Sequence, residues 1–118
     1  MELLPAELAI KVTRIIVALQ QEAERYTPVG TTPVIESATL HFTRVIDPGN
    51  QLPGYTGVWR NARNDRCGML NFNSDHSFFA EYDLFCPHPR DPRWFVEMVT
   101  AWGSDEQVQC EVKLIPSL

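Results

Sequence analysis

The stretch that decides the fold is PAELAIKVTRIIVALQQEAERY, residues 5–26. Its apolar residues recur at steps of three and four, the spacing that places side chains on one face of an α-helix. Pro5 suits the first helical turn, where its missing N–H has no partner to lose. We therefore expect one amphipathic helix from about Pro5 to Arg25, ended by Thr27-Pro28. The predicted buried face consists of Leu8, Val12, Ile15, Ile16, Leu19, Ala23 and Tyr26.

Beyond this helix the hydrophobic period changes from about 3.6 to 2. In residues 34–46, Leu40 and Phe42 alternate with His41 and Thr43, which is typical of a strand buried on one side only. The sequence DPGN at 47–50 predicts a turn, because proline pre-sets φ and glycine accepts positive φ. Further strands are expected at 55–60, 68–73, 77–85 and 107–115, with a hairpin loop over 61–66.

Residues 94–102 allow two interpretations. As a helix, the segment would be capped by Asp91, begin at Pro92 and stop before Gly103. As a strand, it would use the β-branched residues that sheets favour, here Val96, Val99 and Thr100. The two caps favour the helix, together with a stripe of helical spacing formed by Trp94, Phe95, Met98, Ala101 and Trp102.

The sequence thus predicts a single α+β domain over residues 1–118. An N-terminal amphipathic helix would pack on a mostly antiparallel, curved sheet of four to five strands, with a second helix near 92–102. A chain of this length, 44% apolar and 21% charged, fits one ordinary globular domain.

The composition also limits where in the cell the protein is expected and what kinds of partner it is expected to bind. No apolar run approaches the ~18 residues of a membrane span, and Glu2, Glu7, Lys11 and Arg14 interrupt any signal-like run at the start. Three cysteines, an odd number, fit reduced thiols better than a disulfide framework. We therefore expect a soluble cytoplasmic protein. The net charge of -5 disfavours nucleic acid as a partner.

The best candidate for a recognition loop is WRNARNDR, residues 59–66. Arginine binds carboxylate or phosphate through two parallel hydrogen bonds, and a neighbouring aromatic ring offers stacking. A solvated hairpin tip is the alternative interpretation. Residues 81–111 contain seven acidic side chains against two arginines, so a basic hairpin could meet the acidic half of a second copy in an isologous dimer. The residues concerned are Trp59, Arg60, Arg63 and Arg66.

Candidates for chemistry are fewer. Cys86 and His88 are two residues apart in an extended segment, so a thiol and an imidazole could share a face. A zinc site needs three or four ligands, so two more would have to come from His41, His76, Cys67, Cys110 or an acidic residue, and no spacing brings them together. The alternative is a proline-rich loop whose cysteine ends a core strand. Glu81 and Asp83 could work as a paired general acid and base. The alternative is that both lie on a solvent-exposed face of a strand. The sequence predicts no catalytic set, no metal and no cofactor.

Three functions remain open. The favoured one is a small non-enzymatic interaction protein that binds itself or another protein, with no membrane partner. The second is a small-ligand binder with a cavity between helix and sheet, and the third is an enzyme using Cys86 and His88. Aromatic residues that would pack in the core, anchor an interface or line the cavity are Phe78, Tyr82, Trp94 and Trp102.

Overall fold

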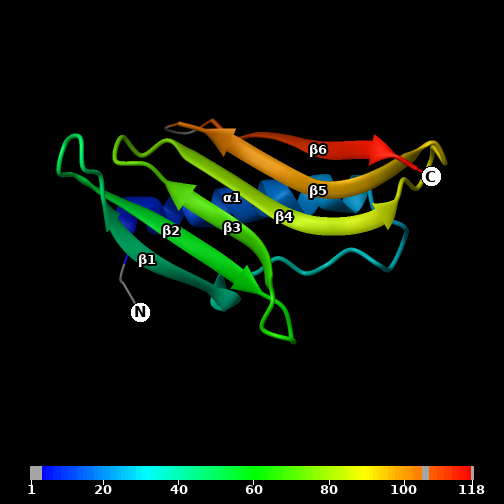
Figure 1. The fold of residues 1–118 in the computed structure, drawn as a ribbon, viewed down its shortest axis with the longest axis horizontal. Helices are drawn as coiled ribbons and strands as arrows, with labels where there is room; N and C mark the ends of the chain where they lie inside the picture. Colours follow the sequence, from blue (N-terminus) through cyan, green and yellow to red (C-terminus); the bar gives the residue numbers. More distant parts are fainter. Residues whose placement is uncertain (1–3, 105–106, 118) are drawn as a thin grey trace.

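The computed structural model describes residues 4–104 and 107–117 and shows an α+β fold. One long helix precedes a six-stranded antiparallel sheet, in which every strand pairs with the next along the chain (Figure 1). A short 3₁₀ turn, η1 (Ser37–Thr39), leads into the first strand. The elements are α1 (Ala6–Arg25), β1 (Leu40–Ile46), β2 (Pro53–Arg60), β3 (Arg66–Phe72), β4 (Phe78–Pro87), β5 (Trp94–Gly103) and β6 (Gln109–Pro116).

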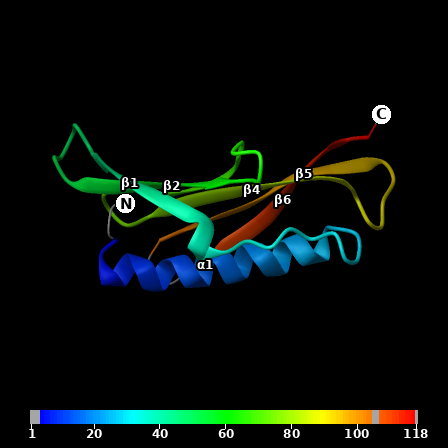
Figure 2. The same ribbon diagram turned by 90° about the horizontal axis from the view of Figure 1, so that it is seen from below.

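The helix α1 covers one face of the sheet, as Figure 2 shows from the side. It lies against β4, β5 and β6. Its buried side chains are Leu8, Val12, Ile15, Leu19 and Ala23, so the predicted amphipathic helix is confirmed. In the described chain, no helix is both long enough and apolar enough to cross a membrane.

The side chain of Gln20 fixes the connector that follows the helix. Its Nε2 donates to the carbonyl of Pro33 (3.0 Å), and its Oε1 accepts from the backbone N–H of Ile35 (2.8 Å). The returning chain therefore runs back along α1 before it enters the sheet (Figure 2). The strand expected over 34–46 accordingly begins only at Leu40.

The core lies between α1 and the sheet. Leu40, Trp59, Gly68 and Tyr82 are direct neighbours across β1 to β4. The rings of Trp59 and Tyr82 meet edge to face, with centroids 5.5 Å apart. Gly68 leaves room for both rings, because a Cβ there would lie 2.8 Å from Tyr82 and 3.0 Å from Trp59.

Two predictions about the fold were wrong. The sheet has six strands instead of four to five, and the second helix expected near 92–102 is the strand β5. The predicted cap residue Asp91 lies in the turn between β4 and β5, where its carboxylate accepts hydrogen bonds from the backbone and side chain of Arg93. Capping chemistry is common to helix starts and such turns, so these residues could not distinguish them.

An irregularity in the sheet explains the misleading pattern in β5. Asp83 pairs with Met98 and Cys86 with Val96, so two residues of β4 stand opposite Glu97 alone. Glu97 is also the extra residue on the side of β6. Such a bulge breaks the alternation of a strand, and the buried residues Val96 and Val99 therefore stand three apart, as they would in a helix.

Candidate functional site

The candidate site is the sheet face opposite α1, here called the open face. Figure 1 looks onto this face, with α1 behind the sheet. No element within residues 4–104 and 107–117 packs on it (Figure 2). An antiparallel sheet can present one face to water, and polar side chains are then expected there. The open face departs from that expectation.

Four side chains form an apolar patch in the middle of the open face. Val58 and Met69 are direct neighbours across β2 and β3, and Phe79 and Trp102 across β4 and β5. The two pairs are joined diagonally, since Met69 stands opposite Glu81, two residues from Phe79. Phe79 is 40% exposed, and the other three are half-buried. Methionine and aromatic residues are enriched at the centres of protein interfaces.

Cations and anions are separated on the open face. Arg60 and Arg66 stand opposite each other at the β2–β3 end. On β4 to β6, Thr100 pairs with both Glu81 and Glu111, which places these two carboxylates on the open face. The face is therefore basic on one side and mainly acidic on the other, although Lys113 on β6 lies 3.8 Å from Glu97.

Asp83 extends the acidic side next to Glu81. Burial raises the pKa of the Asp83 carboxyl, and the negative charge of Glu81 adds to this effect. Arg66 forms an ion pair with Glu81 at 3.3 Å, whereas no cation of the described residues lies within 4 Å of Asp83. The ionised form of Asp83 is thus only partly compensated inside the chain.

A polar atom without a partner lies beside the apolar patch. The amide oxygen Oδ1 of Asn71 is buried, and no donor among the described residues reaches it. Asn71 stands between Thr56 and Phe79 across the sheet. Buried carbonyl groups nearly always accept a hydrogen bond, so Asn71 is an exception among the described residues, although its oxygen is covered and does not reach the surface of the open face.

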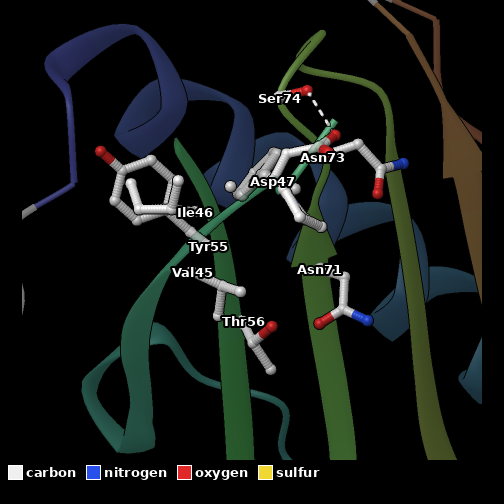
Figure 3. A pocket seen from close by; sticks show the side chains of 11 residues that line it. Val45, Ile46, Asp47, Tyr55, Thr56, Asn71, Asn73 and Ser74 are labelled. Carbon is white, nitrogen blue, oxygen red and sulfur yellow. Dashed lines mark hydrogen bonds between the residues drawn. The ribbon is translucent and has the colours of Figure 1, made fainter. Parts of the chain in front are cut away.

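Asn71 also lines a hollow of about 250 Å³ between the β1–β2 and β3–β4 turns (Figure 3). Asp47 and Ser74 close one end, with a 3.3 Å hydrogen bond from the serine hydroxyl to the carboxylate. Val45 and Thr56 contribute to its wall. The volume is below the ~300–1,000 Å³ of typical small-molecule sites, and the hollow is open to solvent, so it offers weak support for a ligand pocket.

The predicted recognition hairpin divides into two parts. Arg60, Arg63 and Arg66 are exposed, as expected for a recognition loop or a solvated tip. Trp59 is 1% exposed, and its indole N–H donates to the carbonyl of Glu36 at 2.9 Å. Because this ring is part of the core, it cannot stack on a partner beside the arginines.

The remaining aromatic candidates do not form one cavity. Tyr82 and Phe78 face α1, whereas Trp102 lies on the open face. Burial, chiefly, raises the pKa of the Tyr82 hydroxyl, and the neighbouring thiol of Cys67 adds to the shift. Trp94 stands opposite Pro116 at the far end of β5 and is half-buried.

Cys86 and His88 both contact Tyr26 at the end of α1. The Cys86 thiol points to the carbonyl of Tyr26 (3.6 Å), and the His88 ring meets the tyrosine ring edge to face. His88 Nδ1 accepts two backbone N–H bonds, from Arg90 (3.0 Å) and Asp91 (3.1 Å). Both side chains therefore help to hold the β4–β5 turn against the helix end.

This geometry gives little support to chemistry at Cys86. Burial raises the pKa of its thiol, whereas a nucleophilic cysteine needs a lowered pKa. Among the residues that the structure describes, no three histidine, cysteine or acidic side chains are grouped as metal ligands would be.

No protein-family model, curated protein or solved structure matches this chain. The open face is therefore identified as the candidate site by its geometry alone.

Proposed function

We propose that this protein is a non-enzymatic interaction protein that binds another polypeptide across its open face. The observation that carries the proposal is the apolar patch of Val58, Met69, Phe79 and Trp102 on a sheet face that no described element covers. Placing these side chains in water costs about 25 cal/mol per Å² of apolar surface. A bound partner would remove that cost.

The surroundings of the patch have the anatomy of an interface. Well-packed interfaces combine an apolar centre with a polar rim. Here the rim contains Arg60 and Arg66 on one side and Glu81 and Glu111 on the other.

The three cysteines support the cytoplasm as the location of this interaction. Cys67, Cys86 and Cys110 are all free, as expected for a protein of a reducing compartment. Burial, chiefly, raises the pKa of Cys110 to about 11, so its thiol stays protonated at neutral pH and reacts slowly. The thiols of Cys86 and Cys110 therefore fit structural positions better than an active site.

Site-specific photo-cross-linking tests the proposal. The photoreactive residue p-benzoylphenylalanine replaces Phe79 on the open face or, as a control, Ile10 on the outer face of α1, which is 60% exposed. Cells producing each variant at its natural level are irradiated, and the adducts are identified by mass. We expect an adduct with one defined polypeptide from position 79 and none from position 10. The absence of an adduct at 79, or the same adducts at both positions, would contradict the proposed function.

A further inference from the structure

We infer that the polypeptide bound to the open face is a second copy of this chain, related to the first by a two-fold axis parallel to the strands. This inference rests on the proposed function, because it names the partner of the same surface. Its strongest support is that the open face is complementary to itself in charge.

The charges of the open face are divided along the strand order. Arg60 and Arg66 lie on β2 and β3, whereas Glu81, Asp83 and Glu111 lie on β4 and β6. Lys113 on β6 is the exception on the acidic side, where it lies 3.8 Å from Glu97, and Arg66 is paired with Glu81 where the two sides meet. A two-fold axis parallel to the strands places β1–β3 of each copy over β4–β6 of the other. The basic side of each copy then faces the acidic side of the other, so the same contact occurs twice, as an isologous interface requires.

The same axis brings the two apolar patches together. β3 and β4 are the middle strands of the sheet, and they carry Met69 and Phe79. A patch at the middle of the face contacts its own copy across the axis, which gives the apolar centre of the interface. The molecule measures 47 × 29 Å in the plane of the sheet. That cross-section can supply the roughly 800 Å² that each partner of a standard interface buries.

Arg66 is already paired with Glu81 within the chain, but each side of the open face keeps one charged group, Arg60 or Asp83, that has no ion-pair partner among the described residues. Arg60 stands directly opposite Arg66, and like charges at opposed positions destabilise a sheet. Asp83 is close to Glu81 and has no ion-pair partner in the described part of the chain. Apposition of the two sides brings cations to the carboxylates and carboxylates to the arginines.

A second copy fits this pattern better than a basic protein does. A uniformly basic partner would complement the acidic side but would be repelled by Arg60 and Arg66. The net charge of -5 opposes self-association at long range, but physiological salt screens that repulsion beyond about 8 Å. Contacts within the interface therefore decide the outcome.

Charge reversal with complementation tests the inference. One variant, Arg60→Glu with Arg66→Glu, makes both sides of the open face acidic; the other, Asp83→Lys with Glu111→Lys, makes both basic. By sedimentation equilibrium we expect the wild type to form a dimer of twice 13.5 kDa. Each variant alone should dimerise at least about tenfold more weakly. An equimolar mixture should restore a 1:1 complex, because both contacts are then complementary.

Two controls keep this result interpretable. Arg14→Glu with Arg44→Glu changes the net charge equally, at exposed positions on α1 and on the α1 side of β1, and should leave dimerisation unchanged. Arg60→Gln with Arg66→Gln removes the cations without adding a carboxylate beside Glu81. It replaces the first variant if urea titration shows that the latter is unfolded.

The possible results separate the inference from the proposed function. A wild-type chain that stays monomeric, with no complex on mixing, overturns the inference, and so does a dimer that neither variant weakens. If position 79 cross-links to a different polypeptide while the chain stays monomeric, the proposed function stands and the second copy is wrong. If there is neither a dimer nor an adduct at 79, both fail.

Discussion

Asp83 links the electrostatics of the open face to the stability of the fold. Burial and the neighbouring Glu81 raise the pKa of its carboxyl. The ionised form is therefore less favourable in the folded chain than in the unfolded chain. The resulting penalty is fully present above the folded pKa and disappears as the pH falls below the unfolded value of about 3.9.

We therefore predict that Asp83→Asn stabilises the protein at pH 7. The gain should be below about 1 kcal/mol, because the group is partly exposed and solvent screens it, and it should vanish at pH 3. Urea unfolding measures both values at protein concentrations at which sedimentation shows a monomer, because a second copy would bring cations to this carboxylate. A loss of stability at pH 7 would show that the carboxylate makes a favourable contact that the structure lacks.

Asp75, in the turn between β3 and β4, provides the opposite case. Hydrogen bonds from the side chain (2.6 Å) and the backbone N–H (2.9 Å) of Ser77 lower the pKa of its carboxyl. Its contribution to stability is present above the unfolded pKa and is lost as the pH falls through the lower, folded value. Asp75→Asn should thus destabilise the protein at pH 7 and have no effect in strong acid. If both substitutions shift stability in the same direction, the pKa directions are wrong.

At the scale of single residues, the sequence predicts which side chains are exposed better than it predicts which groups they bind. The arginines at 60, 63 and 66 are exposed, as their composition suggests. The core position of Trp59 could not be predicted, because its indole binds the carbonyl of Glu36, 23 residues earlier in the chain. Asn71 gave no signal at all, since a buried unpaired oxygen is a property of the assembled sheet.

At the scale of elements, long and regular periods were sufficient to predict structure. The helix over 5–25 was predicted to within one residue of α1. The strand expected over 77–85 is β4 (Phe78–Pro87), and Phe78 and Ala80 are buried on one side of it before the bulge. Prediction failed at β5, where the bulge at Glu97 breaks the period of 2. Pairing with both β4 and β6 outweighs the caps and the helical stripe, and those partners are distant in sequence.

The packing of the sheet leads to a prediction at Gly68. A Cβ there would lie 2.7 Å from the carbonyl oxygen of Glu81, besides its contacts with the Trp59 and Tyr82 rings. Because displacing a backbone atom costs more energy than rotating a side chain, Gly68→Ala should destabilise the fold by about 1–3 kcal/mol. Chemical unfolding measures the loss, and near-ultraviolet circular dichroism should show a changed environment of the Trp59 ring.

Gly49→Ala is the matched control for that substitution. Its new Cβ would meet only the carboxylate oxygen of Asp47, at 3.2 Å in an exposed turn, so the change in stability should stay near 0.5 kcal/mol or less. Equal losses at 49 and 68 would contradict the crowding argument and would point to a general effect of replacing glycine.

At the scale of the whole molecule, the open face follows from the topology. Six consecutive antiparallel strands present two faces, and one helix of 20 residues can cover only one of them. The alternation within each strand was readable from the sequence. Which of the two alternating sets faces α1, and whether anything covers the other, depends on how the whole chain is placed. The existence of an uncovered sheet face therefore could not be predicted from the sequence, although the sequence contains every residue that forms it.

Phe78 and Phe79 allow the two faces to be tested with the same substitution at adjacent positions. Phe78 is 4% exposed and packs edge to face on Phe72, with centroids 6.2 Å apart, whereas Phe79 is 40% exposed. Phe78→Ala should cost about 3–5 kcal/mol, because it opens a cavity in the core. Phe79→Ala should cost less than about 1 kcal/mol. It should nevertheless weaken binding at the open face about tenfold or more, as truncating a central aromatic residue of an interface does. Urea titration and sedimentation equilibrium on both variants separate stability from association. Equal losses of stability would show that the second face is covered, and undiminished association of Phe79→Ala would place the interface elsewhere.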